Sequence, residues 1–208
     1  MLKLQPHSGL ATTSRLRGAT TTGTTPAVRD WIVLMTAGAV AALASTFIDF
    51  SLRIPGHAIL RAVFPMTIGL ALVPRYGAGT VMGCSAIATA LVLHFGGFVG
   101  TGLGLGAMTS LSATGPLLDW TLRRSDGGWR MYLAFATAGL TSNLLAFVVR
   151  GTAKAAGWEH LGRRPLAAWL PPAAISYAVC GLLAGLLAGA VWFYGRRRSD
   201  DPSREMQP

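Results

Sequence analysis

The chain has 208 residues, of which 51% are hydrophobic and only 12% are charged. Soluble domains usually carry about 25% charged residues, so this composition excludes an ordinary soluble domain and indicates that lipid is the main solvent. The net charge of +10 does not indicate nucleic-acid binding, because the basic residues lie between apolar segments and at the two tails. Such a distribution is typical of membrane proteins, and we therefore expect an all-α membrane domain of about six transmembrane helices.

The N-terminal region, residues 1–29, is rich in Thr, Ser and Gly, is basic and has no acidic residue. This composition predicts a disordered tail. The apolar run that follows contains Ala42-Leu43-Ala44-Ser45, which fits a signal-peptidase site, so cleavage is an alternative. Because the run continues through Phe50 to a length that can span a bilayer, we expect it to be retained. The membrane domain should then cover residues 30–195, and residues 196–208 should form a second tail of mixed charge.

Six segments meet or approach the length of about 20 apolar residues that a membrane span needs. They are 31–50, 54–73, 77–98, 103–122, 130–150 and 172–194. A glycine-rich link at 96–106 separates the third from the fourth segment. Five spans with a re-entrant link are therefore an alternative to six.

Basic residues predict the orientation of the spans, because cytoplasmic loops carry an excess of Lys and Arg. Both tails, the turn at Arg75 and the loop before Arg130 are basic, which places the two termini in the cytoplasm and the chain in the cell membrane. The loop between the last two spans is an exception, since it is basic but should lie outside. Its charged residues are Arg150, Lys154, Glu159, Arg163 and Arg164. Either the preference of basic residues for the cytoplasmic side does not hold for this loop, or the loop is basic for a functional reason.

Small residues recur at the spacing that allows helices to pack closely in lipid. They form two pairs and one triple: Ala37 and Ala41; Gly79 and Gly83; Gly181, Gly185 and Gly189. The spacing alone leaves open whether each face meets another helix of this chain or a second protein.

The second span carries an ionisable pair near its start, His57 and Arg61, which are four residues apart and therefore share one helix face. Arg61 lies about 10 Å into the span at the usual helical rise. A charge at the centre of a span costs about 2.5 to 3.5 kcal/mol on insertion scales, and such a residue usually faces a partner or a cavity. Two interpretations follow: a structural ion pair between Arg61 and Asp49, or a ligand-binding arginine that Asp49 or His57 tunes.

Two further polar positions lie inside apolar segments. Asn143, near the middle of the fifth span, predicts an interhelical hydrogen bond, with a substrate contact as the alternative. Asp119 and Arg123 are four residues apart at the end of the fourth span, which predicts an ordinary helix-end ion pair.

The sequence has no motif that indicates an enzyme, a cofactor site or a metal site. Glycines between Gly100 and Gly106 satisfy a dinucleotide fingerprint only superficially, because they lie between two apolar helices and no strand precedes them. The chain also lacks a Gly-x-Ser-x-Gly elbow, a His-Glu-x-x-His pair and a phosphate-binding Gly-Lys-Ser/Thr loop. We therefore expect a protein that does not hydrolyse ATP itself.

Four features occur together in a characteristic order. They are the pair Ala37 and Ala41, the segment Ile54-Pro55-Gly56, the turn Pro74-Arg75-x-Gly77, and the glycine triple 181–189 before a basic tail. Over roughly residues 31–198, this pattern resembles the substrate-binding (S) components of energy-coupling factor transporters.

The resemblance implies a role in uptake of a small molecule. Ala37 and Ala41 would contact a transmembrane coupling subunit, and cytoplasmic ATPases would energise the cycle. The ligand would bind near the outer face, with Asp49, His57, Arg61 and Asn143 as candidates. Metal-ion members of the family carry a histidine at the extreme N-terminus, and no matching motif exists here, which disfavours cobalt or nickel.

The outer excess of arginine favours a small anionic or zwitterionic, vitamin-like ligand, because Arg binds carboxylate and phosphate with two parallel hydrogen bonds. The alternative is a membrane scaffold that does not transport, in which the glycine faces bind another membrane protein and the buried charges are structural.

Overall fold

The computed structural model describes residues 28–48, 55–97, 104–124, 129–158 and 165–199. Within these ranges the chain forms six α-helices and no strand, which confirms the helical class. The helices are α2 (Val28–Phe47), α3 (Ala58–Leu72), α4 (Ala78–Phe95), α5 (Leu105–Arg124), α6 (Trp129–Ala155) and α7 (Leu166–Ser199). The described ranges do not include Asp49, Arg163 or Arg164. They also exclude both predicted tails, apart from the helical residues 28–29 and 196–199.

Four of the helices are long and apolar enough to cross a membrane: α2, α4, α6 and the Leu166–Phe193 part of α7. The chain is therefore a multi-pass membrane protein by length and composition. Of the other two helices, α3 has only 15 residues, and α5 includes Asp119 and several hydroxyl side chains.

The starts of α7 and α3 differ most from the sequence prediction. Helix α7 begins at Leu166 rather than at 172. Pro171 and Pro172 therefore lie inside its early turns instead of preceding it. Helix α3 begins at Ala58, because residues 55–57 form a turn with Gly56 at a φ of +85°.

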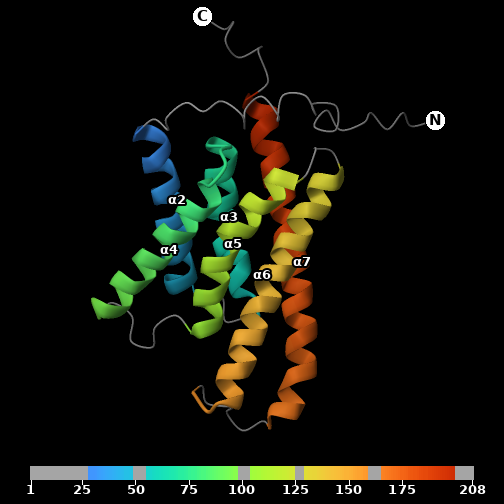
Figure 1. Ribbon diagram of the computed structural model, residues 1–208. Helices are drawn as coiled ribbons and strands as arrows, with labels where there is room; N and C mark the ends of the chain where they lie inside the picture. Colours follow the sequence, from blue (N-terminus) through green and yellow to red (C-terminus); the bar gives the residue numbers. More distant parts are fainter. Residues whose placement is uncertain (1–27, 49–54, 98–103, 125–128, 159–164, 200–208) are drawn as a thin grey trace, which may run out of the picture.

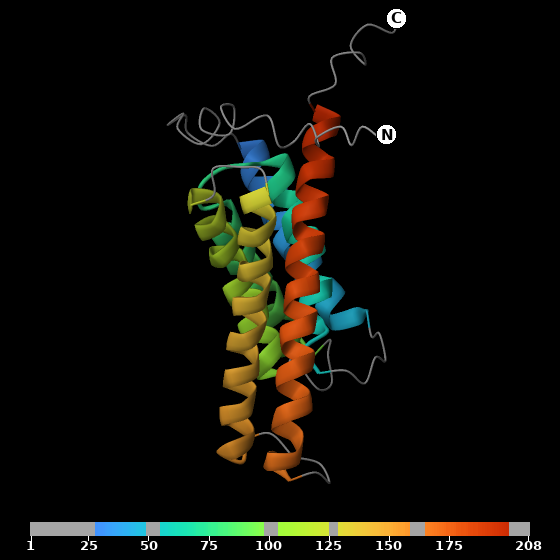
Figure 2. The ribbon, with the colours of Figure 1, turned by 90° about the vertical axis from the view of Figure 1, so that its right-hand side faces the viewer.

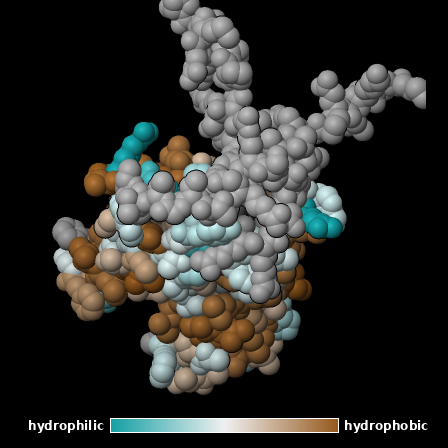
Figure 3. Space-filling model, turned by 45° about the horizontal axis from the view of Figure 1, so that its top comes forward, coloured by the Kyte–Doolittle hydropathy of each residue, from teal (hydrophilic) through white to brown (hydrophobic). Residues whose placement is uncertain are grey.

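Consecutive helices run in opposite directions, so Val28 and Ser199 lie at the same end of the bundle, which we call the near end (Figure 1). Helices α6 and α7 extend beyond the others at the opposite, far end (Figure 2). At 1.5 Å per residue their lengths of about 40 and 51 Å exceed a hydrocarbon core of about 30 Å. Hydrophobic side chains cover the lower part of the face that Figure 3 shows.

Glycine faces bring pairs of helices of this chain into backbone contact. A Cβ at Gly79 would lie 2.2 Å from the carbonyl oxygen of Gly115, and one at Gly185 would lie 2.2 Å from that of Phe135. Gly181 faces Gly139 in the same α6–α7 interface. Gly83 and Gly189 are less constrained by backbone: the nearest atom to a Cβ would be a carbonyl 3.5 Å away at Gly83 and the Tyr132 ring 2.9 Å away at Gly189.

The small residues of α2 pack inside the bundle as well. Ala41 is fully buried, and Ala37 lies against Gly69 of α3. Helix α2 is in tight contact with α4 at Gly38, where a Cβ would lie 2.3 Å from the carbonyl oxygen of Met82. In this conformation Ala41 has no exposed surface with which to contact a second protein.

Asp119 caps the N-terminus of the neighbouring helix α4. Its buried carboxylate accepts hydrogen bonds from the backbone N–H groups of Gly79 and Thr80, both at 2.8 Å, and from the Thr80 hydroxyl at 2.7 Å. These contacts place Asp119 between α5 and α4, whereas the sequence predicted a pair with Arg123 on the same helix. The side chain of Arg123 lies outside the described part of the chain.

Candidate functional site

The turn at residues 55–57 is held against α6 and α7 at the far end of the bundle. The Asn143 amide donates to the carbonyl oxygen of Gly56 (3.2 Å) and to that of Tyr177 (2.7 Å), and the Ser176 hydroxyl donates to that of Pro55 (2.9 Å). A Cβ at Gly56 would lie 2.9 Å from the Tyr177 ring, so only glycine lets the turn approach α7 so closely. Asn143 therefore joins three parts of the fold through one side chain.

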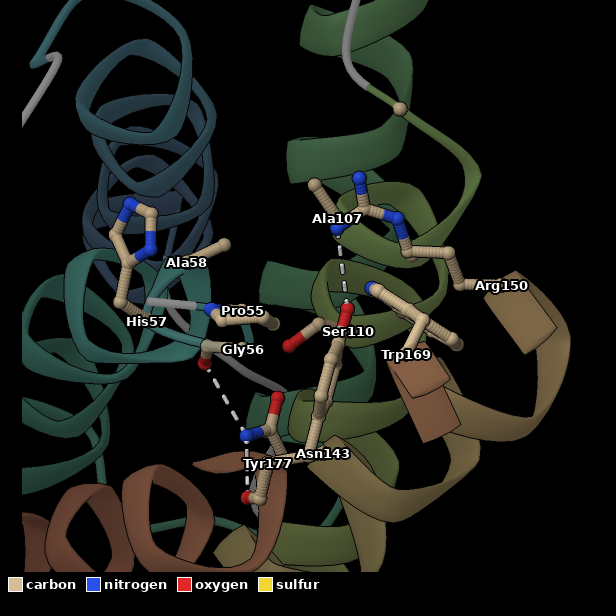
Figure 4. Close-up of a pocket in the computed structure, with 12 residues that line it drawn as sticks. Pro55, Gly56, His57, Ala58, Ala107, Ser110, Asn143, Arg150, Trp169 and Tyr177 are labelled. Carbon is tan, nitrogen blue, oxygen red and sulfur yellow. Dashed lines mark hydrogen bonds between the residues drawn. The ribbon is translucent and has the colours of Figure 1, made fainter. Parts of the chain in front are cut away.

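A cavity of about 380 Å³ opens beside this turn (Figure 4). Its walls are the 55–58 segment, the first turns of α5, and the facing sides of α6 and α7. The polar or aromatic side chains that line it are His57, Ser110, Asn143, Arg150, Trp169 and Tyr177. Ligand pockets usually measure about 300 to 1,000 Å³, so this cavity suits a small molecule.

The wall formed by α6 and α7 combines cationic and aromatic side chains. Arg150 Nη1 donates to the Tyr177 hydroxyl at 3.4 Å, and Lys154 Nζ lies 5.4 Å from the centre of the Trp169 ring. Phe147 packs on Trp169 and Tyr177, with ring centroids 5.9 and 5.5 Å apart. Within the described part of the chain, Arg150 lines the cavity and no acidic residue does, so this wall gives the cavity a positive charge.

Arg61 has a different environment from Arg150. Its Nη1 donates to the carbonyl oxygens of Ser45 (3.4 Å) and Ile48 at the C-terminal end of α2, and its Nη2 lies 2.6 Å from Nε2 of His57. A cation at the carboxyl end of a helix is favourable, because the last carbonyl groups have no partner within the helix. These contacts give Arg61 a structural role in which it caps α2.

The Arg61 contact also fixes the tautomer of His57. A guanidinium group has only hydrogen-bond donors, so Nε2 of His57 must accept, and the proton of the neutral ring is then on Nδ1. Figure 4 shows His57 at the edge of the cavity. Arg61 thus contacts a residue that lines the cavity, His57, without being among the lining residues itself.

The four predicted binding residues thus occupy different places. His57 and Asn143 line the cavity, Arg61 does not, and Asp49 lies outside the described residues. The pairing of Arg61 with Asp49 stays a prediction. Among the described residues, no group of three or more His, Cys, Asp or Glu could hold a metal ion.

Sequence reasoning did not include four of the lining side chains among the binding residues: Ser110, Arg150, Trp169 and Tyr177. One signal was available for Arg150, since it follows Asn143 by seven residues, or two turns, and therefore lies on the same helix face. Ser110 and the two aromatic residues have no such signal, because only the packing of α5 against α6 and α7 brings them together.

The chain was also compared with known proteins. No family model, curated protein or solved structure matches it.

Proposed function

We propose that this protein is the membrane-embedded solute-binding subunit of an uptake transporter, energised by separate ATPase subunits, as its resemblance to S components implies. The observation that carries the proposal is the cavity, which offers a small molecule a positive, aromatic-lined wall and the polar groups of His57 and Asn143. The substrate class would be a small anionic or zwitterionic molecule. The chain has no phosphate-binding loop, so the energy must come from partners.

The proposed topology has six spans in the cell membrane, with the near end of the bundle in the cytoplasm. Basic residues support this orientation, since Arg29, Arg75 and Arg130 all belong to the near end, and cytoplasmic segments favour Lys and Arg. The cavity would then open to the outside. A fluorescent protein fused after Pro208 should fluoresce in the cytoplasm, and alkaline phosphatase fused there should be inactive. Active phosphatase at this fusion point would reverse the orientation.

The decisive experiment is to isolate the protein from its native membrane in mild detergent. We expect a small molecule, identified by mass spectrometry, and a transmembrane coupling subunit with two ATPases to be isolated with it. A coupling subunit would have to bind residues other than the buried Ala41.

A cavity-filling variant serves as the matched control. The Cβ of a residue at position 106 would lie 3.4 Å from Cδ of Arg150, so Gly106→Leu should occupy the cavity. This variant should lose the small molecule and keep the partner subunits. If the unmodified protein brings down neither a small molecule nor partners, under conditions that preserve known complexes, the transport function is wrong and the scaffold alternative gains support.

A further inference from the structure

We propose that the cavity contains an oxyanion subsite, in which the Ser110 hydroxyl, Arg150 and the N-terminus of α5 bind one carboxylate or phosphate group of the ligand. This inference rests on the proposed function for its biological meaning and deepens it by assigning the chemical group that is recognised. The physical site itself can be tested without any transport partner.

The Ser110 hydroxyl is buried at the cavity without a hydrogen-bond partner. Ser110 is only 3% exposed, and its Oγ has no hydrogen-bond partner. The other hydroxyl side chains of α5 all donate to backbone carbonyl groups of the same helix: Thr109, Ser112, Thr114 and Thr121. This is the usual way in which Ser and Thr are satisfied within a helix. Ser110 alone among them points into the cavity instead (Figure 4).

A buried hydroxyl without a partner is costly, so the position is explained if a bound group completes the hydrogen bond. A hydroxyl can donate to any acceptor atom, and the surrounding charge decides which acceptor is favoured. Of the described residues that line the cavity, Arg150 is a cation and none is acidic. An anionic acceptor is therefore favoured over a neutral or cationic one.

The start of α5 also borders the cavity. This 20-residue helix begins at Leu105, and the cavity is lined by Gly104, which precedes it, and by Gly106 in its first turn. The first N–H groups of a helix carry a partial positive charge and bind anions. Gly106 has no side chain to separate the backbone from Arg150 and the Tyr177 hydroxyl, which lie 3.4 and 3.5 Å from where its Cβ would be. The helix start and the guanidinium group of Arg150 therefore face the same small space.

The Arg150 side chain is positioned for this role by its hydrogen bond to Tyr177. Tyr177 is itself held by its contacts with Phe147 and Gly56. An arginine fixed in this way loses less conformational entropy on binding an oxyanion than one that is free to move. The subsite is thus preorganised on three different segments of the fold.

The test uses the purified full-length protein in nanodiscs of phosphatidylcholine, with tryptophan fluorescence as the readout of binding. The probes are benzoate, inorganic phosphate and, as a cation of similar size to benzoate, benzylammonium. Benzoate or phosphate should bind, and benzylammonium should bind at least tenfold more weakly. Equal binding of the anion and the cation would overturn the proposal.

The variants Ser110→Ala and Ser112→Ala form a matched pair on the same helix. A hydrogen bond to a charged group is worth about tenfold or more in affinity, so Ser110→Ala should weaken anion binding about tenfold. Ser112 donates within its own helix, and Ser112→Ala should leave the affinity within about twofold. Because the Ser110 hydroxyl has no partner to lose and is costly while it is unpaired, Ser110→Ala should keep or raise the melting temperature. Equal affinities of the two variants, or the absence of anion binding to the unmodified protein, would show that Ser110 faces only water.

A final arm separates a soluble solute from a lipid headgroup as the source of the oxyanion. Nanodiscs that contain phosphatidylglycerol should bind benzoate as well as those of phosphatidylcholine if the ligand is a solute. If phosphatidylglycerol instead competes with benzoate, and Ser110→Ala abolishes the competition, the oxyanion subsite holds while the proposed uptake function fails. The two proposals can therefore fail separately.

Discussion

Replacing Asp119 with alanine is expected to lower the free energy of unfolding by about 3 kcal/mol or more, because three donors would lose an ionised acceptor in a buried site. Two of these donors are the backbone N–H groups at the start of α4, and the third is the Thr80 hydroxyl. The carboxylate also lies at the positive end of the helix dipole. Asp119 is only 3% exposed, so the three donors would lose their acceptor in a site that is shielded from bulk water.

The measurement is reversible unfolding in mixed micelles of a mild detergent and dodecyl sulfate, followed by circular dichroism. Thr80→Val removes only one of the three hydrogen bonds and should cost about 1 kcal/mol. Arg123→Ala separates the cap from the helix-end ion pair predicted from the sequence. If Asp119 acts as a cap, Arg123→Ala should change stability by less than about 0.5 kcal/mol. Similar losses for Asp119→Ala and Arg123→Ala would instead support the ion pair.

The class of the fold could be predicted from the sequence because lipid leaves few choices for the backbone. In a bilayer every N–H and C=O group must be satisfied within the segment, so long apolar runs become helices. Each predicted span overlaps one helix of the structure. The helix boundaries were less predictable, as α7 shows: the predicted span began at residue 172, whereas the helix begins at Leu166 and contains Pro171 and Pro172 in its early turns.

The glycine spacing indicated helix packing, but it did not rank the positions. Gly79 and Gly83 look equivalent in the sequence, whereas only Gly79 is in tight contact with a backbone carbonyl group, that of Gly115. In α2 the spacing indicated Ala37 and Ala41 but not Gly38, which is in tight contact with the backbone of α4. Such contacts depend on the partner helix, and the spacing within one helix contains no information about it.

For charged residues, too, the sequence of one helix does not show which groups will surround a side chain. Arg61, near the start of α3, and Arg150, near the end of α6, both lie in the far half of the bundle. The sequence favoured Arg61 as a binding residue because it is deeper in its apolar segment. In the structure, carbonyl groups of α2 and the His57 ring surround the Arg61 guanidinium group, while Arg150 borders the cavity. Depth in a span predicts that a charge has a partner, but it does not distinguish a structural partner from a ligand.

The second large effect is expected for Gly185→Ala in α7. The new Cβ would lie 2.2 Å from the carbonyl oxygen of Phe135 and 2.6 Å from Cα of Ala136. Both atoms belong to the backbone of α6, so no side-chain rotation can relieve the overlap and the two helices must separate. Overpacking of this kind costs about 1 to 3 kcal/mol. Since α6 and α7 also form one wall of the cavity, we expect a loss at the upper end of that range, measured by the same unfolding assay.

Gly151→Ala is the matched control, because Gly151 belongs to α6 and the same change is made inside a helix. There the nearest atom to the new Cβ is Leu170 Cδ2 at 4.0 Å, an ordinary contact. Alanine is favoured over glycine in a helix by about 1 kcal/mol, so Gly151→Ala should leave stability unchanged or raise it. Opposite signs for the two variants would show that the α6–α7 interface depends on backbone contact at Gly185. Equal effects would mean that helix propensity alone accounts for both, and that the close approach of the two helices contributes nothing measurable.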